Sequence, residues 1–404
     1  MRICVITTLH EPKDDRIYYK EVLSLRKRYR DITLVAPRSD PDGEHLAPGV
    51  GFAPLSNRKG VIWRLLRLPE ALMVVCRLRP NVCHLQDFDL VLLIPFLRVL
   101  TGARLIYDVH ENFPEHIRHR FSNHPHLGGL LARCVEWLEN KLARKCHVVL
   151  TVVDFQTRRF RRAGVRAVAL YNYPRLELLD VGRAPRPSMK SLENRPVLLF
   201  HGAMSRDRGL FDMLAALGLV RQSIPDVLLL LIGFLSQHDR DETTRVMGEL
   251  HVEGNVQILR HVDHGQIAGW LGIATIGLVP TRPVVAYRHA LPIKLFEFMI
   301  SKVPVLAADL PEIVPYVRTS GAGLLFESGN PVSLAEGISK MLTNEAGLRR
   351  MGENGQRAVE EKWNWSRMEE RLFEVYDELD ALSGRRGART DRAQAGSAVL
   401  GTGR

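Results

Sequence analysis

Short apolar runs alternate with longer amphipathic stretches along most of the chain. Residues 2–8 and 31–37 read as strands rich in β-branched side chains, and residues 16–28 between them have a helical pattern. Further strands of this half are expected at 82–86, 104–110 and 148–153, and further helices at 61–78, 89–100 and 130–146. Strands separated by helices pair in parallel, so the pattern predicts an α/β fold whose sheet is covered on both faces.

A stretch with three prolines at 183–196 interrupts the alternation, which then restarts. In this second half we expect strands at 197–202, 226–233, 255–260, 276–280 and 303–308, and helices at 209–222, 265–274, 331–344, 345–362 and 366–382. The predicted organisation is two doubly wound parallel-sheet domains at 1–185 and 192–364, a helix at 365–382 that packs back towards the first domain, and a disordered basic tail at 383–404.

Length and composition fit two globular domains. The chain has 404 residues, of which 46% are hydrophobic. The longest apolar runs, 90–97 and 227–235, are far shorter than the roughly 20 residues that span a bilayer, and no signal peptide is recognised. The five cysteines are scattered and never spaced C-x-x-C, which argues against a disulfide framework or a zinc site and favours a reducing cytoplasm.

Positive charge is concentrated in the first half. Residues 1–190 carry 32 Lys and Arg against 19 Asp and Glu, which favours an anionic partner: a membrane surface, a phosphorylated substrate or nucleic acid. Nucleic acid is disfavoured because no aromatic residues interleave with the basic clusters. The helix expected near 61–80 places Arg64, Arg67, Arg77 and Arg79 among large apolar residues. It reads either as a sheet-packing helix with solvated arginines or as a membrane-surface helix, and we favour contact with the anionic inner face of a membrane.

Polar residues at the carboxyl ends of parallel strands are the first candidates for chemistry, because ligands bind there in open α/β sheets. After the strand ending at Gly202, Arg206 and Arg208 precede a helix, so that guanidinium groups and free backbone N–H groups make an anion site. A surface loop with solvated arginines is the alternative.

A second candidate is the helix expected to begin near Pro292. Lys294 and Glu297 share one face of it, and the lysine with the helix N-terminus suits a phosphate, while the glutamate suits sugar hydroxyls. A plain surface ion pair is an equally good interpretation of the local spacing.

A third cluster, Asp108, His110 and Glu111, follows a strand in the first half. The histidine there can position a hydroxyl or exchange a proton with it, although a structural histidine is the alternative. Four histidines at 116–126 match no metal-ligand spacing, and we expect a flexible loop and no metal.

Taken together, these stretches resemble the retaining glycosyltransferases of family four, which have the GT-B fold and are also described as glycosyl transferases group 1. The resemblance covers residue 1 to about 380 and rests on "TTLHEPKDDRIYYKEVLSL", "CHLQDFDLVLLIP", "ARLIYDVHENFPE", "HGAMSRDRGL", "LPIKLFEFMISKVPVLAADLPEI" and "VEEKWNWSRMEERLFEVYDEL". It implies two Rossmann-like domains facing a cleft, with the nucleotide-sugar bound by the second.

The resemblance also assigns roles. It implies that Arg208 and Lys294 contact the diphosphate, that Glu297 binds the ribose, that Gly202 lets the loop approach the phosphates, and that His110 faces the transferred sugar. His110, Arg208 and Lys294 would form the catalytic set, and Asp108, Glu111 and Arg16 would lie on the acceptor side with His110.

Three departures from the family stand out. His289 replaces the first of the two glutamates that the family usually has, the second being Glu297. Ala203 replaces an arginine for which Arg206 or Arg282 can substitute. The glycine pair of the family's first loop is replaced by residues that include His10 and Arg16. These changes concern the choice of sugar and the phosphate contacts.

The predicted protein is a cytoplasmic, membrane-peripheral hexosyltransferase for cell-surface glycan synthesis, which uses a nucleotide-diphosphate sugar, a glycan or lipid-linked acceptor, and no metal or other cofactor. Retaining transfer in this family is thought to need no protein nucleophile, because a leaving phosphate oxygen takes the proton of the acceptor and cations stabilise the diphosphate. A nucleotide-sugar epimerase and a non-catalytic nucleotide-sugar-binding subunit of a glycan-assembly complex stay open as alternatives.

Overall fold

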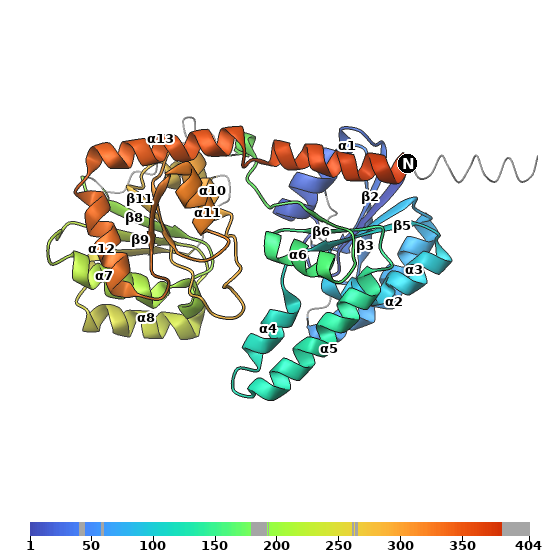
Figure 1. Cartoon of the computed structure of the whole chain (residues 1–404), viewed down its shortest axis with the longest axis horizontal. Coiled ribbons are helices and arrows are strands. Elements are labelled where there is room, and N and C mark those ends of the chain that lie inside the picture. The colour runs from blue at the N-terminus through green and yellow to red at the C-terminus, as the bar shows by residue number, and fades with distance from the viewer. Residues whose placement is uncertain are drawn as a thin grey trace, which may run out of the picture. The chain divides into compact units, whose positions relative to one another are not determined.

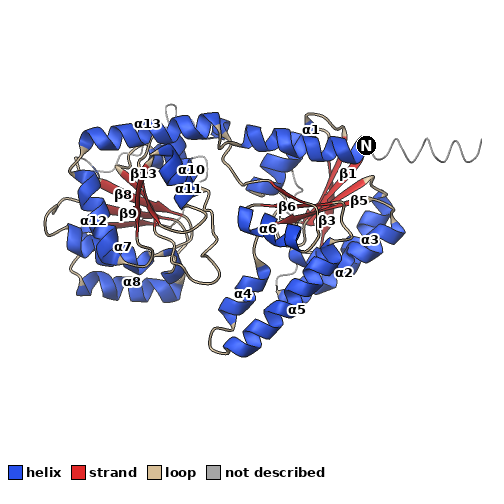
Figure 2. Cartoon of the chain, in the orientation of Figure 1, coloured by secondary structure: helices blue, strands red, loops and turns tan. Residues whose placement is uncertain are grey.

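A computed structural model describes residues 1–39, 45–57, 60–178, 192, 194–260, 262 and 266–381. These residues form two compact α/β units, each built on one parallel sheet (Figures 1 and 2). The first unit comprises residues 1–117, 123–171 and the C-terminal segment from 366, and the second comprises 118–122 and 172–365.

The first unit contains a seven-stranded sheet in the order β3-β2-β1-β4-β5-β6-β7, and every strand pair in it is parallel. Its strands are β1 (Arg2–Ile6), β2 (Asp31–Pro37), β3 (Val50–Leu55), β4 (Val82–Leu85), β5 (Arg104–Val109), β6 (Val148–Thr151) and β7 (Ala167–Ala169). The central strands are buried along nearly their whole length, as expected for a sheet covered by helices on both faces.

The helices of this unit cover the sheet and also extend beyond it, as α4 (Phe113–Arg120) and α5 (Pro125–Ala143) do (Figure 2). The others are the π-helix η1 (Asp15–Val22), α1 (Leu23–Arg26), α2 (Val61–Leu78), the 3₁₀ turn η2 (Phe88–Leu93), α3 (Ile94–Leu100), α6 (Asp154–Arg162) and a helix at 365–381. The last of these is tied to the first unit by Lys27, whose Nζ donates to Glu369 at 2.7 Å, and by Tyr376, whose hydroxyl lies 3.0 Å from Nδ1 of the buried His84.

The second unit contains a six-stranded parallel sheet in the order β10-β9-β8-β11-β12-β13. Its strands are β8 (Val197–His201), β9 (Leu228–Ile232), β10 (Val256–Leu259), β11 (Ile276–Val279), β12 (Val305–Ala308) and β13 (Gly323–Phe326). Its helices are η3 (Leu176–Leu178), η5 (Arg206–Arg208), α7 (Leu210–Val220), α8 (Gln237–Glu249), η6 (Glu253–Asn255), α9 (Ile267–Leu271), α10 (Lys294–Ile300), α11 (Val314–Ser320), α12 (Pro331–Leu342) and α13 (Glu345–Glu361).

Each sheet has a point at which the strand order reverses. It lies between β1 and β4 in the first sheet and between β8 and β11 in the second. Ligands of open α/β sheets bind at the carboxyl ends of the strands beside such a point, so these two edges are where functional residues are sought.

The predicted α/β fold of two doubly wound parallel sheets is confirmed. One local expectation is wrong: residues 116–126 do not form a continuous loop, because α4 extends to Arg120 and α5 begins at Pro125. The second unit begins at residue 172, earlier than the boundary expected from the proline-rich stretch. Most of that stretch and all of the basic tail lie outside the described residues.

In the part of the chain that the structure describes, no helix is both long enough and apolar enough to cross a bilayer.

Candidate functional site

The start of α10 places Lys294 against the end of β8 in the second unit. All seven residues of α10 are buried, because the helix packs so closely on β11 that a Cβ added to Gly277 would lie 2.4 Å from the ring of Phe298. Lys294 is 8% exposed and Glu297 6% exposed. The interpretation of this pair as a plain surface ion pair is therefore wrong.

The ammonium group of Lys294 lies in unusual surroundings for a cation. Its Nζ is 3.6 Å from the centroid of the Phe200 ring, a cation–π contact. Burial, together with the positive charge of Arg208, lowers the pKa of Lys294 to about 7, although the carboxylate of Glu297 opposes this effect. Such a lysine gains its charge readily when an anion binds beside it.

Gly202 brings the loop after β8 directly against this lysine. A Cβ at position 202 would lie 3.2 Å from Nζ of Lys294. The φ angle of Gly202 is +113°, a backbone conformation that residues other than glycine rarely adopt. The residue after β9 also packs closely on this loop, since a Cβ at Gly233 would lie 2.2 Å from the carbonyl oxygen of Gly202. The loop is thus held where its backbone and Lys294 share one surface.

Glu297 lies one turn deeper and is held by a histidine from β8. Nε2 of His201 is 3.4 Å from Oε2 of Glu297. His201 was not among the site residues predicted from the sequence. Its place immediately before Gly202, at the carboxyl end of a central strand, is the signal that identifies it.

The two arginines expected to bind anions differ in their surroundings. Arg208 points its guanidinium towards the ring of Tyr287, at 5.4 Å, and its charge acts on Lys294. Arg206 is instead engaged by Glu242 of α8 and packs over Phe211. Of this pair, Arg208 is the one whose charge reaches the lysine.

Two further residues predicted from the sequence to contact the donor, Arg282 and His289, each lie beside a carboxylate of the second unit. Nε of Arg282 lies 3.4 Å from Asp212, so the guanidinium has a carboxylate beside it. Nδ1 of His289 lies 3.8 Å from Oε1 of Glu312. The position at which the family has a glutamate thus carries a histidine with a carboxylate close by.

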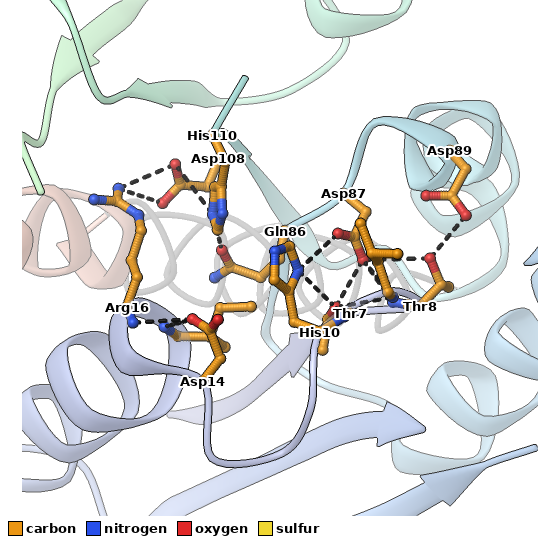
Figure 3. Close-up of polar contacts among 12 residues, drawn as sticks. Thr7, Thr8, His10, Asp14, Arg16, Gln86, Asp87, Asp89, Asp108 and His110 are labelled. Carbon is orange, nitrogen blue, oxygen red and sulfur yellow. Dashed lines mark hydrogen bonds and ion pairs between the residues drawn. The ribbon is translucent and has the colours of Figure 1, made fainter. Parts of the chain in front are cut away.

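In the first unit, a carboxylate at the end of β4 organises the loop after β1 (Figure 3). Oδ2 of Asp87 accepts from the hydroxyl of Thr7 at 2.7 Å and from the backbone N–H of Thr8 at 2.6 Å. Its Oδ1 lies 3.0 Å from Nδ1 of His10. Burial alone would raise the pKa of Asp87, but the hydrogen bond and charge of His10 lower it to about 2.

His10 is a functional candidate that the sequence analysis did not list among the site residues. Burial lowers its pKa, yet the hydrogen bond and charge of Asp87 outweigh this and raise the pKa above the ordinary value. Since Nδ1 faces Asp87, Nε2 remains for a ligand. The signal in the sequence is Asp87 itself, an acidic residue just beyond a strand next to the switch point.

His110, at the end of β5, is oriented by a chain of hydrogen bonds. Gln86 donates its amide to Oε2 of Glu21 at 2.6 Å, which turns Oε1 towards Nε2 of His110 at 2.8 Å. This arrangement places the imidazole proton on Nε2 and leaves Nδ1 as an acceptor. Burial lowers the pKa of His110 to about 4, so the ring is neutral near pH 7.

The rings of His10 and His110 lie 5.2 Å apart and line a small cavity of about 80 Å³. Asp108 and Glu111 also line it, and Glu111 is exposed to solvent. Of the acceptor-side residues expected from the sequence, the structure therefore brings Asp108, His110 and Glu111 to one cavity.

Arg16 is placed differently, because it is not among the residues that line this cavity. It is buried, donates Nη2 to Asp108 at 2.8 Å and places Nε 3.1 Å from Glu21. Although burial alone would raise the pKa of Asp108, the charge of Arg16 holds it well below its usual range. Figure 3 shows the contacts of Arg16 with Asp108 and of Gln86 with His110. Arg16 thus fixes Asp108 and, through Glu21 and Gln86, the orientation of His110.

Glu21, His84 and Asp108 lie close enough together to be considered as metal ligands. Their contacts favour another interpretation. The guanidinium of Arg16 already lies against both carboxylates, and burial with the charge of Asp108 raises the pKa of Glu21 well above its ordinary value. The buried cluster is therefore an ion-pair network with its own cation, which does not fit a metal site.

Two arginines of α2 do not have the solvated positions considered for them. Arg67 is 5% exposed and donates to the carbonyl oxygen of Thr8, and Nη2 of Arg64 lies 3.0 Å from Asp89. Both side chains turn towards the β1 loop. Arg77 and Arg79, at the other end of the helix, are exposed as expected.

Two family models match the chain. The glycosyl transferase 4-like domain matches residues 21–172, and glycosyl transferases group 1 matches residues 184–358. Among relatives, spore coat protein SA of Bacillus subtilis is 25% identical over 248 residues, which are 57% of this chain and 64% of that protein. The chain thus spans less than two thirds of the length of the curated relatives it matches first.

Solved structures show the same fold. Sucrose-phosphate synthase from Thermosynechococcus elongatus is 17% identical with a TM-score of 0.75, over 94% of this chain and 99% of that one. The Anabaena protein Alr3699/HepE in complex with UDP is 14% identical with a TM-score of 0.72, over 94% of this chain and 100% of that one. The same Anabaena protein has also been solved with UDP-glucose.

Proposed function

The chain belongs to the glycosyl transferases group 1 family, and on that footing we propose that it transfers a hexose from a nucleotide-diphosphate sugar to a glycan or lipid-linked acceptor. The observation that carries the proposal is the buried Lys294, whose Nζ lies against Gly202 and beside the charge of Arg208. Two cations at a loop whose backbone can approach a ligand closely suit a diphosphate.

In the proposed donor site, Lys294 and Arg208 bind the diphosphate and Glu297 accepts hydrogen bonds from the ribose. A ribose between these groups is consistent with the spacing of one helical turn between Lys294 and Glu297 on α10. His289 with Glu312 would then contact the sugar. The likeness to a protein solved with UDP and UDP-glucose supports a nucleotide-sugar as donor.

We assign a retaining mechanism without a protein nucleophile. The acceptor oxygen forms a bond to the anomeric carbon on the face from which the diphosphate leaves, the bond from that carbon to the phosphate oxygen breaks, and a leaving phosphate oxygen takes the acceptor proton. Negative charge develops on the diphosphate, where Lys294 and Arg208 stabilise it. In this proposal these side chains, and not a metal ion, neutralise the leaving group.

On the acceptor side, His110 supplies a neutral imidazole. Its Nδ1 accepts a hydrogen bond from a sugar hydroxyl, because Nε2 donates to Gln86. A neutral ring also avoids placing another cation next to a positively charged sugar in the transition state.

A membrane-bound acceptor is supported by the surface of the first unit. Large apolar side chains are exposed on two neighbouring helices, α3 and α5, among them Phe96, Val99, Leu130 and Trp137. Nζ of Lys141 lies 4.6 Å from the centroid of the Trp137 ring, and both residue types are favoured at membrane interfaces. We propose that this face contacts the inner leaflet of the plasma membrane, where lipid-linked intermediates of cell-surface polysaccharides are assembled.

Product analysis tests the proposal. The full chain is incubated with UDP-, GDP-, ADP- and TDP-hexoses, with and without a mixture of lipid-linked and free glycan acceptors. Transfer to an acceptor with the anomeric configuration conserved, seen by proton NMR, is expected. An epimerised nucleotide-sugar without any acceptor would show the epimerase instead, and nucleotide-sugar binding without turnover would show the non-catalytic subunit.

A further inference from the structure

A second, larger cavity opens beside His10 in the first unit. Its volume is about 420 Å³, within the range of small-molecule sites. It lies at the carboxyl ends of β1 and β2 and at the start of α2. It shares Leu9, His10 and Arg64 with the small cavity that His110 lines, so the two cavities are adjacent at His10.

Cations predominate in the lining of this larger cavity. Arg38, Arg64, Arg67 and His10 line it, against a single acidic residue, Glu11. Asp89 pairs with Arg64, and Asp87 with His10. Neither carboxylate is among the residues that line this cavity, so apart from Glu11 the charged groups offered to a ligand are basic.

The surrounding structure fixes two of these cations in place. Arg67 is held by the carbonyl oxygen of Thr8, and Arg64 by Asp89, which in turn accepts from the hydroxyl of Thr8 at 2.7 Å. Arg38 follows β2 and is exposed. Gly60, the residue that precedes α2, also lines the cavity, and the positive end of that 18-residue helix adds to its potential.

We propose that this cavity binds a phosphate group of the acceptor, so that the acceptor is a phosphate ester whose sugar extends past His10 into the small cavity. Guanidinium groups bind phosphate through paired hydrogen bonds, and three arginines around one cavity suit a dianion better than a neutral glycan. The inference rests on the proposed function, because it assumes that the first unit binds the acceptor.

Binding of glucose 1-phosphate to the full chain tests this inference. Calorimetry compares it with glucose, and hydrogen exchange followed by mass spectrometry locates it. The phosphate ester is expected to bind, glucose to bind at least about tenfold more weakly, and protection to appear at residues 8–11 and 60–67. Protection at residues 202–208 and 293–297 instead would place the probe in the second unit and overturn the inference.

Variants separate the cavity from the rest of the molecule. Arg38→Glu reverses an exposed charge, and Arg38→Ala with Arg64→Gln removes two cations. Each should weaken binding of glucose 1-phosphate about tenfold or more. Arg77→Ala, at the far end of the same helix, should leave it unchanged. Unchanged binding in Arg38→Glu, with the fold intact by circular dichroism, would overturn the inference.

Two further arms complete the test. Nucleoside diphosphate binding is measured in the wild type and in the same variants. If the nucleotide binds the wild type while glucose 1-phosphate does not, only the phosphate cavity is refuted. If the nucleotide does not bind the wild type, the proposed function fails by itself. Phosphatidylcholine vesicles with and without polyprenyl phosphate identify the source of the phosphate. Displacement of the probe by the polyprenyl phosphate supports a lipid-linked acceptor, and displacement by soluble hexose phosphates alone supports a free sugar phosphate.

Discussion

The protonation of Lys294 provides a quantitative prediction. Burial and the charge of Arg208, partly opposed by Glu297, lower its pKa from 10.5 to about 7. That difference corresponds to about 5 kcal/mol that disfavours the charged form. At pH 8 about nine tenths of the lysine is therefore neutral in the free protein. A diphosphate bound against Nζ favours the ammonium form, so binding should take up close to one proton.

Calorimetry at pH 8 in buffers with different ionisation enthalpies measures this uptake. We expect about 0.9 proton per bound nucleoside diphosphate at pH 8 and about 0.1 at pH 6, where the lysine is already charged. In Lys294→Met the uptake should vanish and affinity should fall, because the variant keeps the volume of the side chain without its charge. Wild-type binding at pH 8 without proton uptake, or the same uptake in Lys294→Met, would refute the assignment.

The same pKa predicts how stability depends on pH. Between pH 7 and 10.5 the unfolded chain holds a proton on Lys294 that the folded chain lacks, so this residue makes the free energy of unfolding increase with pH across that window. Below pH 7 both states are charged and the full penalty of burial applies. Lys294→Met should therefore be more stable than the wild type at pH 6, by a few kcal/mol, with the difference shrinking towards pH 10 in urea titrations.

Three other variants test the remaining contacts. Gly202→Ala should abolish nucleotide binding because its Cβ would lie 3.2 Å from Nζ of Lys294, whereas Gly164→Ala, with φ of +72° and open space around it, should incur only the backbone strain of about 1–2 kcal/mol and still bind. Asp87→Asn should lower the free energy of unfolding by about 2 kcal/mol at pH 6, because the pKa of Asp87 is about 2 in the folded state. In thermal melts, the difference in stability between Asp87→Asn and the wild type should disappear as the pH falls from about 4 to 2. His110→Leu should reduce kcat about 10- to 100-fold while the nucleotide affinity measured by calorimetry stays the same. The wild-type rate should show no ionisation of His110 between pH 5 and 8. Equal rates in His110→Leu and the wild type would argue against a contact between His110 and the substrate.

The sequence predicted the central strands because they are continuous apolar runs, and it placed β2 and α2 at the bounds that the structure gives. It missed both edge strands of the first sheet, β3 and β7, and one edge strand of the second, β13. The strand β3 contains a glycine and a proline and is only partly buried, while β7 and β13 have three and four residues. Such strands carry too few apolar residues to show a pattern by themselves, and their pairing partners stabilise them.

The candidate site was predictable where one residue could be interpreted by its place at a strand end, as for His110, Lys294 and Gly202. Contacts between distant segments were not. His10 meets Asp87 across 77 positions, and nothing in the spacing of either residue indicates the other. For Arg206 the sequence could not show that Glu242 on α8 engages its charge.

Calorimetric binding of UDP, GDP, ADP and TDP to the wild type and to Glu297→Ala is the decisive test of the proposed donor site. Glu297 is buried beside His201 one turn below Lys294, so its carboxylate is placed to accept from a ribose without holding the diphosphate. We expect one nucleotide to bind preferentially and its affinity to fall about tenfold or more in Glu297→Ala. Failure of all four to bind the wild type, or equal affinity in Glu297→Ala, would contradict the proposed donor site.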